Sequence, residues 1–234
     1  MKLLLDADLL RYELGYSCEI KEGPPMSTHE AALKVHSKMN TLVDMSKCDT
    51  FEVFIGGESH KNFRYTVYPE YKGGRVAPKP HHFRTIGEVL KDDYQAWTVV
   101  GAEVDDVISI LGRSEEEVVV GSRDKDLRQV PGWHFDWGFN TKKHLYFTTP
   151  LGELKLVDGK IVGSGKCFFY AQILMGDRVD NYFGIPKLGP VAAYKILSGL
   201  TTEQQLWEAT YWAYARHYGA EKGLEELIRN ARMA

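Results

Sequence analysis

Acidic residues follow several of the predicted strands, at the points where those strands end. Asp6 ends a predicted strand at residues 2–6, and Asp8 comes two positions later. Further acids follow the next three predicted strands, and these are Glu58, Glu103, Asp105, Asp106, Asp124 and Asp126. Because ligands of open α/β sheets bind beyond the carboxyl ends of the strands, we expect these carboxylates to share one site.

A site with this many carboxylates requires cations, since the negative charges repel one another. Hard oxygen ligands suit Mg²⁺ or Mn²⁺, and we expect two such ions. Two ions about 3.5–4 Å apart can clamp the attacking and leaving oxygens of a phosphodiester and lower the pKa of a bound water. No set of histidines and cysteines in the sequence has the spacing of a zinc site.

The predicted strands alternate with helices, which indicates an α/β core with a largely parallel sheet. The predicted strands are residues 2–6, 51–55, 97–100 and 117–121. The predicted helices between them are residues 28–45, 85–93 and 103–111. Ser27 and Glu30 have the spacing of a capping box at the start of the first helix. Residues 133–162 predict short strands or a hairpin, and the pattern is helical from about residue 168 to the C-terminus.

Residues 60–84 are basic and aromatic, and they form an excursion from the predicted core. They contain six Lys or Arg and one acid, a net charge of +5, whereas the whole chain carries −3. A basic stripe in a chain that also has acidic clusters predicts a surface that follows phosphates beside a metal site. We therefore expect a nucleic acid as the partner.

A second motif lies at residues 184–190 and runs into a predicted helix. Its glycines, on either side of an apolar residue, let the backbone turn tightly and expose N–H groups at a helix start, where phosphate binds. This is the pattern of a helix–hairpin–helix, which grips the DNA backbone without reading its sequence. Just upstream, Asp177 and Asp180 are spaced i, i+3 and are expected to face one way at the end of a helix.

The composition predicts a protein of the cytoplasm. Cys18, Cys48 and Cys167 are odd in number and have no C-x-x-C spacing, which argues against a disulfide framework. No apolar run of the sequence approaches the roughly 18 residues needed to span a bilayer, so no membrane partner is expected. We expect a monomer in a reducing cytoplasm.

Taken in order, the motifs resemble the flap endonuclease family, in particular the compact bacteriophage 5′-3′ exonucleases related to the 5′-nuclease domain of bacterial DNA polymerase I. Asp6 resembles the family's first metal aspartate, and residues 68–75 resemble its Tyr-Lys-x-x-Arg segment at the base of a helical arch. Residues 103–106 resemble its Glu-Ala-Asp-Asp signature, and residues 124–127 resemble its Asp-x-Asp pair. Residues 176–189 resemble its last metal pair and its helix–three-turn–helix. The resemblance covers the chain from residue 3 to about residue 200. It implies that the expected cytoplasm is that of the host if the chain comes from a bacteriophage.

The resemblance implies a PIN-like nuclease core at residues 1–165, with an arch or clamp at about 58–87. It also implies a helical DNA-binding region at residues 166–234 that contains the helix–three-turn–helix. The implied enzyme is a metal-dependent 5′-3′ exodeoxyribonuclease or structure-specific 5′ nuclease of DNA replication or repair, in which water attacks a phosphodiester and leaves a 5′-phosphate and a 3′-hydroxyl. The implied substrates are DNA with 5′ ends, flaps or branches, and the RNA strand of hybrids is a further candidate.

Individual roles also follow from the resemblance. The implied metal ligands are Asp6, Glu103, Asp105, Asp106, Asp124, Asp126, Asp177 and Asp180. Lys72 and Arg75 would neutralise the scissile phosphate, and Asp106 would also hold the attacking water. Tyr71 would stack on a displaced base, with a place in the protein core as the alternative. The residues implied to bind duplex DNA are Gly184, Lys187, Gly189 and Lys195, and a K⁺ ion is implied at the same turn.

One position departs from the family pattern. The family has an aspartate after its second strand, and counting back from Tyr71 places Gly57 or Glu58 there. If Gly57 holds this position, one carboxylate is missing and Glu58 is the candidate to replace it as a ligand. The arch segment is also short, which favours an open clamp over a closed, threaded hole.

Two other functions fit part of the sequence. The run of residues 5–8 also fits the start of the haloacid-dehalogenase-like phosphatases, with Asp6 as nucleophile and Asp8 as acid/base. That hypothesis leaves residues 103–106, the basic segment and the glycine turn unexplained. A non-catalytic protein that binds branched DNA would keep the fold without the chemistry, but its many carboxylates would repel phosphates unless cations lay between them.

Overall fold

The computed structural model describes residues 1–57, 62–74, 77–138 and 144–234, and the chain divides into two compact units. The first unit comprises Met1–Lys61, Ala77–Leu127 and Gly132–Phe147. The second comprises Asn62–Val76, Arg128–Pro131 and Thr148–Ala234. This division differs from the expected boundary near residue 165, because part of the expected arch and the chain from Thr148 onward belong to the second unit. None of the helices in the described ranges is long and apolar enough to cross a membrane.

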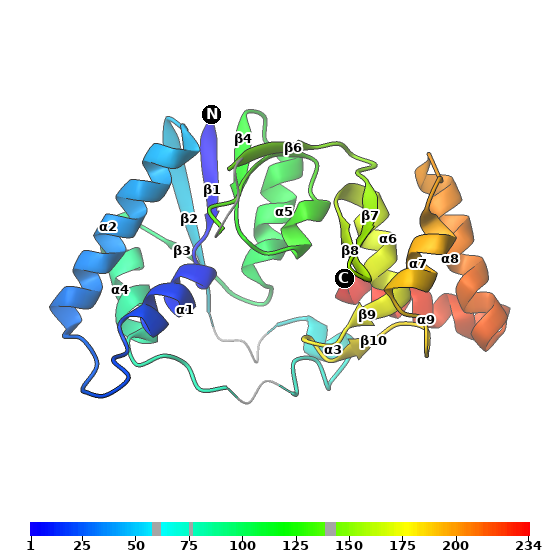
Figure 1. Ribbon diagram of the computed structural model, residues 1–234, viewed down its shortest axis with the longest axis horizontal. Coiled ribbons are helices and arrows are strands. Elements are labelled where there is room, and N and C mark those ends of the chain that lie inside the picture. Colours follow the sequence, from blue (N-terminus) through cyan, green and yellow to red (C-terminus); the bar gives the residue numbers. More distant parts are fainter. Residues whose placement is uncertain (58–61, 75–76, 139–143) are drawn as a thin grey trace. The chain divides into compact units, whose positions relative to one another are not determined.

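The first unit is built on a six-stranded sheet in the order β3-β2-β1-β4-β5-β6 (Figure 1). Its strands are β1 (Lys2–Asp6), β2 (Thr50–Gly56), β3 (Trp97–Val99), β4 (Val118–Gly121), β5 (Gly132–Phe135) and β6 (Leu145–Thr148). Strands β1 to β5 pair in parallel, with β1 between β2 and β4. The predicted α/β class with a largely parallel sheet is therefore confirmed.

Helices pack against this sheet and form the core of the first unit with it. They are α1 (Asp8–Ser17), α2 (Thr28–Ser46), α4 (Phe83–Tyr94) and α5 (Val104–Ser114), and Figure 1 shows α1, α2 and α4 lying together. Leu3 and Leu5 of β1 share one core with Met39 of α2 and Ile86 of α4, and all four are fully buried. Leu4 points to the opposite face of the sheet and is fully buried too. Burial on both faces accounts for the uninterrupted leucine run of β1.

Two helices of the first unit compare differently with the sequence predictions. Helix α2 begins with the predicted capping box, in which the Glu30 backbone N–H donates to Ser27 Oγ at 3.3 Å and the Ser27 N–H donates to the Glu30 carboxylate at 2.8 Å. Helix α1 was not predicted, because its buried face is only one turn long and consists of Leu10, Leu14 and Gly15. Position 15 has no room for a larger residue than glycine, because a Cβ there would lie 2.7 Å from the Pro80 side chain.

The second unit is mainly helical, as predicted for the C-terminal region. Its helices are α6 (Gly165–Met175), α7 (Pro190–Leu197), α8 (Glu203–Tyr218) and α9 (Ala220–Met233), and the hairpin of β7 (Leu154–Val157) and β8 (Lys160–Gly163) precedes them. Leu174, Ala193, Leu206 and Leu227 are buried together and connect the four helices in one core. The predicted hairpin within residues 133–162 corresponds to β7 and β8.

Two short elements of the second unit were not predicted. The antiparallel pair β9 (Gly176–Asp177) and β10 (Tyr182–Phe183) interrupts the helical pattern expected from residue 168 onward. Gly176 has φ +71°, and a Cβ there would lie 2.5 Å from the Gly184 N and the Tyr182 O, so only glycine lets the two strands approach. Helix α3 (Arg64–Val67) contacts α9, where Arg64 Nε donates to the Met233 carbonyl at 3.2 Å.

Candidate active site

Asp6 is buried at the carboxyl end of the central strand β1. Its Oδ2 accepts a hydrogen bond from Ser122 Oγ at 2.8 Å, and its Oδ1 accepts one from the Asp8 N–H at 3.2 Å. The pKa of Asp6 is raised to about 7, first by burial and then by the charges of Asp8 and Asp124, while the bond from Ser122 opposes the rise. Asp6 therefore lies close enough to both of these acids for their charges to repel its own.

The start of α5, which follows β3, carries three further acids. The Glu103 N–H donates to Asp106 Oδ2 at 2.8 Å, and the Glu103 side chain accepts from the Asp106 backbone in return. This capping box places carboxylates at the positive end of the helix dipole, which favours them there. The pKa of Asp105 is raised well above its ordinary value, first by burial and then by the charges of Glu103, Asp6, Asp106 and Asp124.

The loop after β4 brings two aspartates to the same edge of the sheet. The Asp124 N–H donates to Ser122 Oγ at 2.9 Å, so Ser122 links this loop to Asp6. Asp124 Oδ1 accepts from the Asp126 N–H at 2.9 Å, at the start of the short 3₁₀ helix η2 (Asp126–Gln129). Sequence reasoning missed Ser122, although its position between a strand end and two aspartates is a signal for such a link.

Strand β2 ends at Gly56, and the next residue, Gly57, has no room for a side chain. A Cβ on Gly57 would lie 2.8 Å from the Val99 carbonyl oxygen of β3. The Asp8 carboxylate lies at this strand end instead, where its Oδ1 accepts from the Gly56 N–H at 2.9 Å and from Arg11 Nη1 at 3.1 Å. A carboxylate therefore accompanies β2, but it comes from the first turn of α1.

In the second unit, Asp177 and Asp180 lie in the β9–β10 hairpin and not at the end of a helix, which corrects the prediction. Asp177 Oδ1 accepts from the Val179 N–H at 2.7 Å and so shapes the turn. The Tyr71 hydroxyl donates to Asp180 Oδ2 at 3.1 Å, and the Lys72 N–H donates to the Asp180 carbonyl at 2.9 Å. The two motifs, far apart in sequence, are thereby joined within one unit.

Tyr71 is only 1% exposed and is buried in a cluster with Tyr182. A ring with this burial presents no face to a base, so the structure favours the core role of Tyr71 over base stacking. Lys72 has a left-handed backbone, with φ +55°, and its Nζ lies 5.0 Å from the centre of the Tyr71 ring. Arg75 and Glu58, which the sequence also singles out, lie outside the described residues.

The predicted glycine turn lies between β10 and α7. A Cβ on Gly184 would collide with the backbone of Leu174, so glycine is required for the close approach of this turn to α6. Gly189 is the N-cap residue of α7. Because glycine has no side chain, it cannot cap the first N–H groups of that helix. Lys187 and Lys195 are both exposed and add positive charge to this region.

The first unit thus brings together five of the predicted ligands, and these are Asp6, Glu103, Asp105, Asp106 and Asp124. Within the described ranges, no three His, Cys, Asp or Glu side chains are grouped so that they could hold a metal ion, and several of the carboxylate oxygens accept the hydrogen bonds given above. The donor chemistry nevertheless suits a hard divalent cation, because every donor is a carboxylate. The pKa values of Asp6 and Asp105 are raised first by burial and then by the repulsion between these neighbouring acids.

Sequence comparison relates the chain to known nucleases. Residues 2–143 match the family described as 5′-3′ exonuclease, N-terminal resolvase-like domain. The 5′-3′ exonuclease of Buchnera aphidicola subsp. Acyrthosiphon pisum is 24% identical over 216 residues, which cover 88% of this chain and 72% of that protein. DNA polymerase I of Bacillus subtilis is 30% identical over 190 residues, which cover 73% of this chain but only 20% of the polymerase.

Solved structures support the same relationship at the level of the fold. The 5′-exonuclease of bacteriophage T5, solved with bound zinc, has a TM-score of 0.63 and 20% identity, covering 100% of this chain and 89% of that chain. The bacteriophage T5 flap endonuclease, solved with DNA and metal ions, has a TM-score of 0.60 and 19% identity, covering 100% of this chain and 88% of that chain. Since the family match alone covers more than half of the sequence, the chain belongs to the 5′-3′ exonuclease family.

Proposed function

We propose that the protein is a divalent-metal-dependent phosphodiesterase that cuts DNA from or near 5′ ends, as a 5′-3′ exonuclease, a flap endonuclease or both. The observation that carries this proposal is the convergence of acids from three strand ends on the buried Asp6. Burial first, and then the charges of the neighbouring acids, raise the pKa values of Asp6 and Asp105, and a bound cation would relieve the repulsion. Membership of the 5′-3′ exonuclease family supports the same chemistry.

The carboxylates suit two Mg²⁺ or Mn²⁺ ions, and such ions supply a water nucleophile at neutral pH and stabilise charge on the phosphodiester. We assign Asp6, Glu103, Asp105 and Asp124 to the first ion. We assign Asp126 to the second ion, and the roles of Asp177 and Asp180 as further ligands stay predictions from the sequence. Asp106 orients the attacking water, and its bond from the Glu103 N–H fixes its carboxylate for that task.

The substrate phosphate and the duplex need positive groups. Lys72 and Arg75 are proposed to neutralise the scissile phosphate as charge develops on it, and the products are a 5′-phosphate and a 3′-hydroxyl. The turn from Gly184 to Gly189 and the exposed Lys187 and Lys195 are proposed to hold the duplex backbone, with K⁺ at the turn. These contacts read no bases, so we expect recognition of DNA structure and not of sequence.

The phosphatase hypothesis fits the geometry less well. A nucleophilic aspartate must present an oxygen to the phosphorus atom, but Asp6 is 5% exposed and both of its oxygens accept hydrogen bonds. Asp8, the acid/base of that hypothesis, is bound to Arg11 and to the Gly56 N–H. These bonds suit a structural carboxylate more than a group that exchanges protons.

A cleavage time course tests the proposal. The substrates are a 5′-flap, a blunt duplex, a single strand and an RNA–DNA hybrid, each labelled at either end and incubated with Mg²⁺, Mn²⁺ or EDTA. Products released from the 5′ side only when metal is present are expected, and their lengths separate exonuclease from flap cutting. Binding of branched DNA without cleavage in either metal would instead favour the non-catalytic hypothesis.

A further inference from the structure

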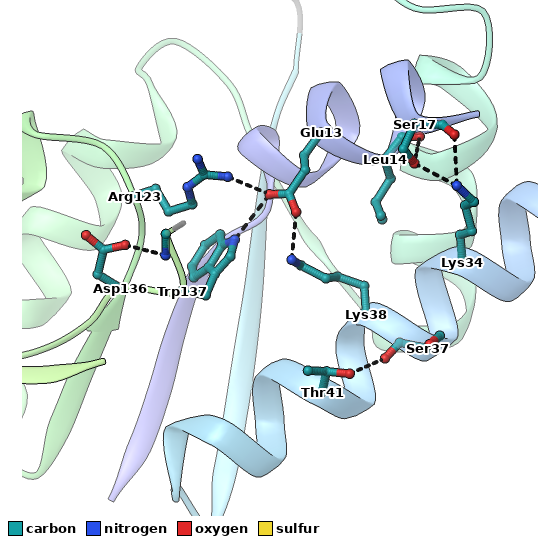
Figure 2. A network of polar contacts seen from close by, with 11 residues as sticks. Glu13, Leu14, Ser17, Lys34, Ser37, Lys38, Thr41, Arg123, Asp136 and Trp137 are labelled. Carbon is teal, nitrogen blue, oxygen red and sulfur yellow. Dashed lines mark hydrogen bonds and ion pairs between the residues drawn. The ribbon is translucent and has the colours of Figure 1, made fainter. Parts of the chain in front are cut away.

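Glu13 of α1 joins four segments of the first unit although it belongs to none of the motifs above. Its Oε1 accepts from Lys38 Nζ at 2.6 Å, and its Oε2 accepts from Arg123 Nη1 at 2.9 Å and from Trp137 Nε1 at 3.2 Å. Figure 2 shows these three donors converging on one carboxylate. The donors come from α2, from the loop after β4 and from the segment after β5.

The Glu13 carboxylate is a firm anchor for these donors. Burial alone would raise its pKa, but the hydrogen bonds from Lys38 and Trp137 and the charges of Lys38 and Arg123 outweigh burial, so the pKa lies below its ordinary value. Glu13 therefore stays ionised at neutral pH. The side chains of Glu13 and Arg123 are 24% and 32% exposed, and such a partly buried network holds its members better than an isolated surface pair does.

Arg123 is the residue before Asp124, and its side chain lies at the surface of the first unit. Leu9, Arg123, Asp124 and Lys125 line a shallow depression on the surface of the first unit. The Arg123 side chain is 32% exposed although Glu13 anchors it, so part of it is accessible from solvent. Two cations thus flank a proposed metal ligand at a concave surface, an arrangement that complements a phosphate.

We propose that Arg123, oriented by Glu13, binds a phosphate of the DNA strand in the depression beside Asp124. Glu13 is a positioning residue in this arrangement, because it reaches the substrate only through Arg123. The inference rests on the proposed nuclease function and adds a substrate contact to it. Sequence reasoning leaves Arg123 open between neutralising Asp124 and contacting phosphate, and the ion pair with Glu13 favours the second role because it directs a guanidinium nitrogen to a different acid.

Salt-dependent DNA binding provides the test. Fluorescence anisotropy of a labelled 5′-flap DNA is measured from about 50 to 200 mM salt with Ca²⁺ in place of Mg²⁺, which gives the Kd and the slope of log K against log salt. Loss of one phosphate contact reduces the slope by about one unit, so we expect Arg123→Gln to show this reduction and about fivefold to tenfold weaker binding. Arg123→Lys keeps the charge and should restore the slope while binding less tightly than wild type, since it lacks the planar fork.

Matched variants separate a substrate contact from a structural one. Arg113→Gln makes the same charge change at the far end of α5, where the side chain is exposed, and should leave both the Kd and the slope unchanged. Glu13→Gln keeps the Arg123 charge but loosens its anchor, so binding should weaken by about threefold with the slope retained. Arg123→Met, which keeps the aliphatic stem, replaces Arg123→Gln if that variant does not fold.

An unchanged slope in Arg123→Gln, with only a lower melting temperature, would show that the ion pair is structural and would overturn the inference. Cleavage of the same flap DNA by the wild-type protein in a parallel reaction with Mg²⁺ would confine that failure to the inference. Wild-type protein that neither binds nor cleaves DNA with any metal would overturn the proposed function and the inference with it.

Discussion

Replacing Asp6 by Asn should stabilise the metal-free protein against unfolding at neutral pH, although Asp6 belongs to the proposed active site. The pKa of Asp6 rises from an ordinary 3.8 to about 7 in the folded protein. Between these two values the unfolded chain has lost a proton that the folded protein still holds, so the free energy of unfolding falls as pH rises through this window. About three pKa units correspond to about 4 kcal/mol of lost stability, fully present above about pH 7.

The substitution also changes the hydrogen bonds of the side chain. Ser122 Oγ and the Asp8 N–H donate to different oxygens of Asp6, and an asparagine amide offers only one oxygen, so one bond worth about 1 kcal/mol is lost. We therefore expect Asp6→Asn to be about 3 kcal/mol more stable than wild type at pH 8 in EDTA and about 0.5 kcal/mol less stable at pH 4.

Urea unfolding followed by tryptophan fluorescence in EDTA, at pH values from 4 to 8, measures this crossover. Asp44→Asn, on the exposed side of α2, is the matched control and should change the free energy of unfolding by less than about 0.5 kcal/mol at each pH. Excess Mg²⁺ should reverse the order at pH 8, because binding stabilises only the form that holds the ion. A difference between Asp6→Asn and wild type that stayed constant with pH would refute the argument from burial and neighbouring charge.

Three further substitutions test other parts of the proposal. Asp124→Asn should lower the cleavage rate by about 100-fold or more while changing the Kd for flap DNA by less than about threefold, as single-turnover kinetics and anisotropy would show; equal losses in both would argue against a ligand role. Gly184→Ala should lower the free energy of unfolding of the second unit by about 1–3 kcal/mol in a urea titration, because its Cβ would collide with the Leu174 backbone; an unchanged midpoint would mean that the turn can shift. Lys187→Gln should weaken duplex binding and lower its salt slope by about one unit, with single-strand binding affected less; an unchanged slope would remove this side chain from the DNA path.

The parts of the fold that could be predicted from the sequence are those with local signals. The strands β1, β2, β3 and β4 coincide with the predicted ones to within about one residue, because each is a short apolar run bounded by glycine or charge. The Ser27 capping box is likewise a local exchange between residues three apart. The expected edge of carboxylates follows from topology, since parallel strands end on the same side of a sheet.

The parts that could not be predicted depend on contacts between distant residues. Asp177 and Asp180 have helical spacing, yet the close approach of Gly176 to Gly184 turns the chain into a hairpin. The sequence leaves two roles open for Tyr71, a place in the protein core or stacking on a base. Its hydrogen bond to Asp180, 109 residues away, favours the core. No local pattern carries such information.

A carboxylate lies at the end of β2 although the residue that follows the strand, Gly57, is not an acid. Parallel pairing brings the Val99 carbonyl of β3 within 2.8 Å of the place where a Gly57 Cβ would be, so an aspartate there would require the strands to move. Asp8 enters the same region from α1, and Arg11 of that helix pairs with it at 3.1 Å and donates to the Gly56 carbonyl at 3.0 Å. The terminal peptide of β2 is therefore bound on both sides by one ion pair, which holds a carboxylate at this edge. Because β1 lies directly beside β2, the first turn of α1, which follows β1, can reach the end of β2. The carboxylate at this strand end is therefore supplied by a neighbouring element and not by the residue that follows β2 in sequence.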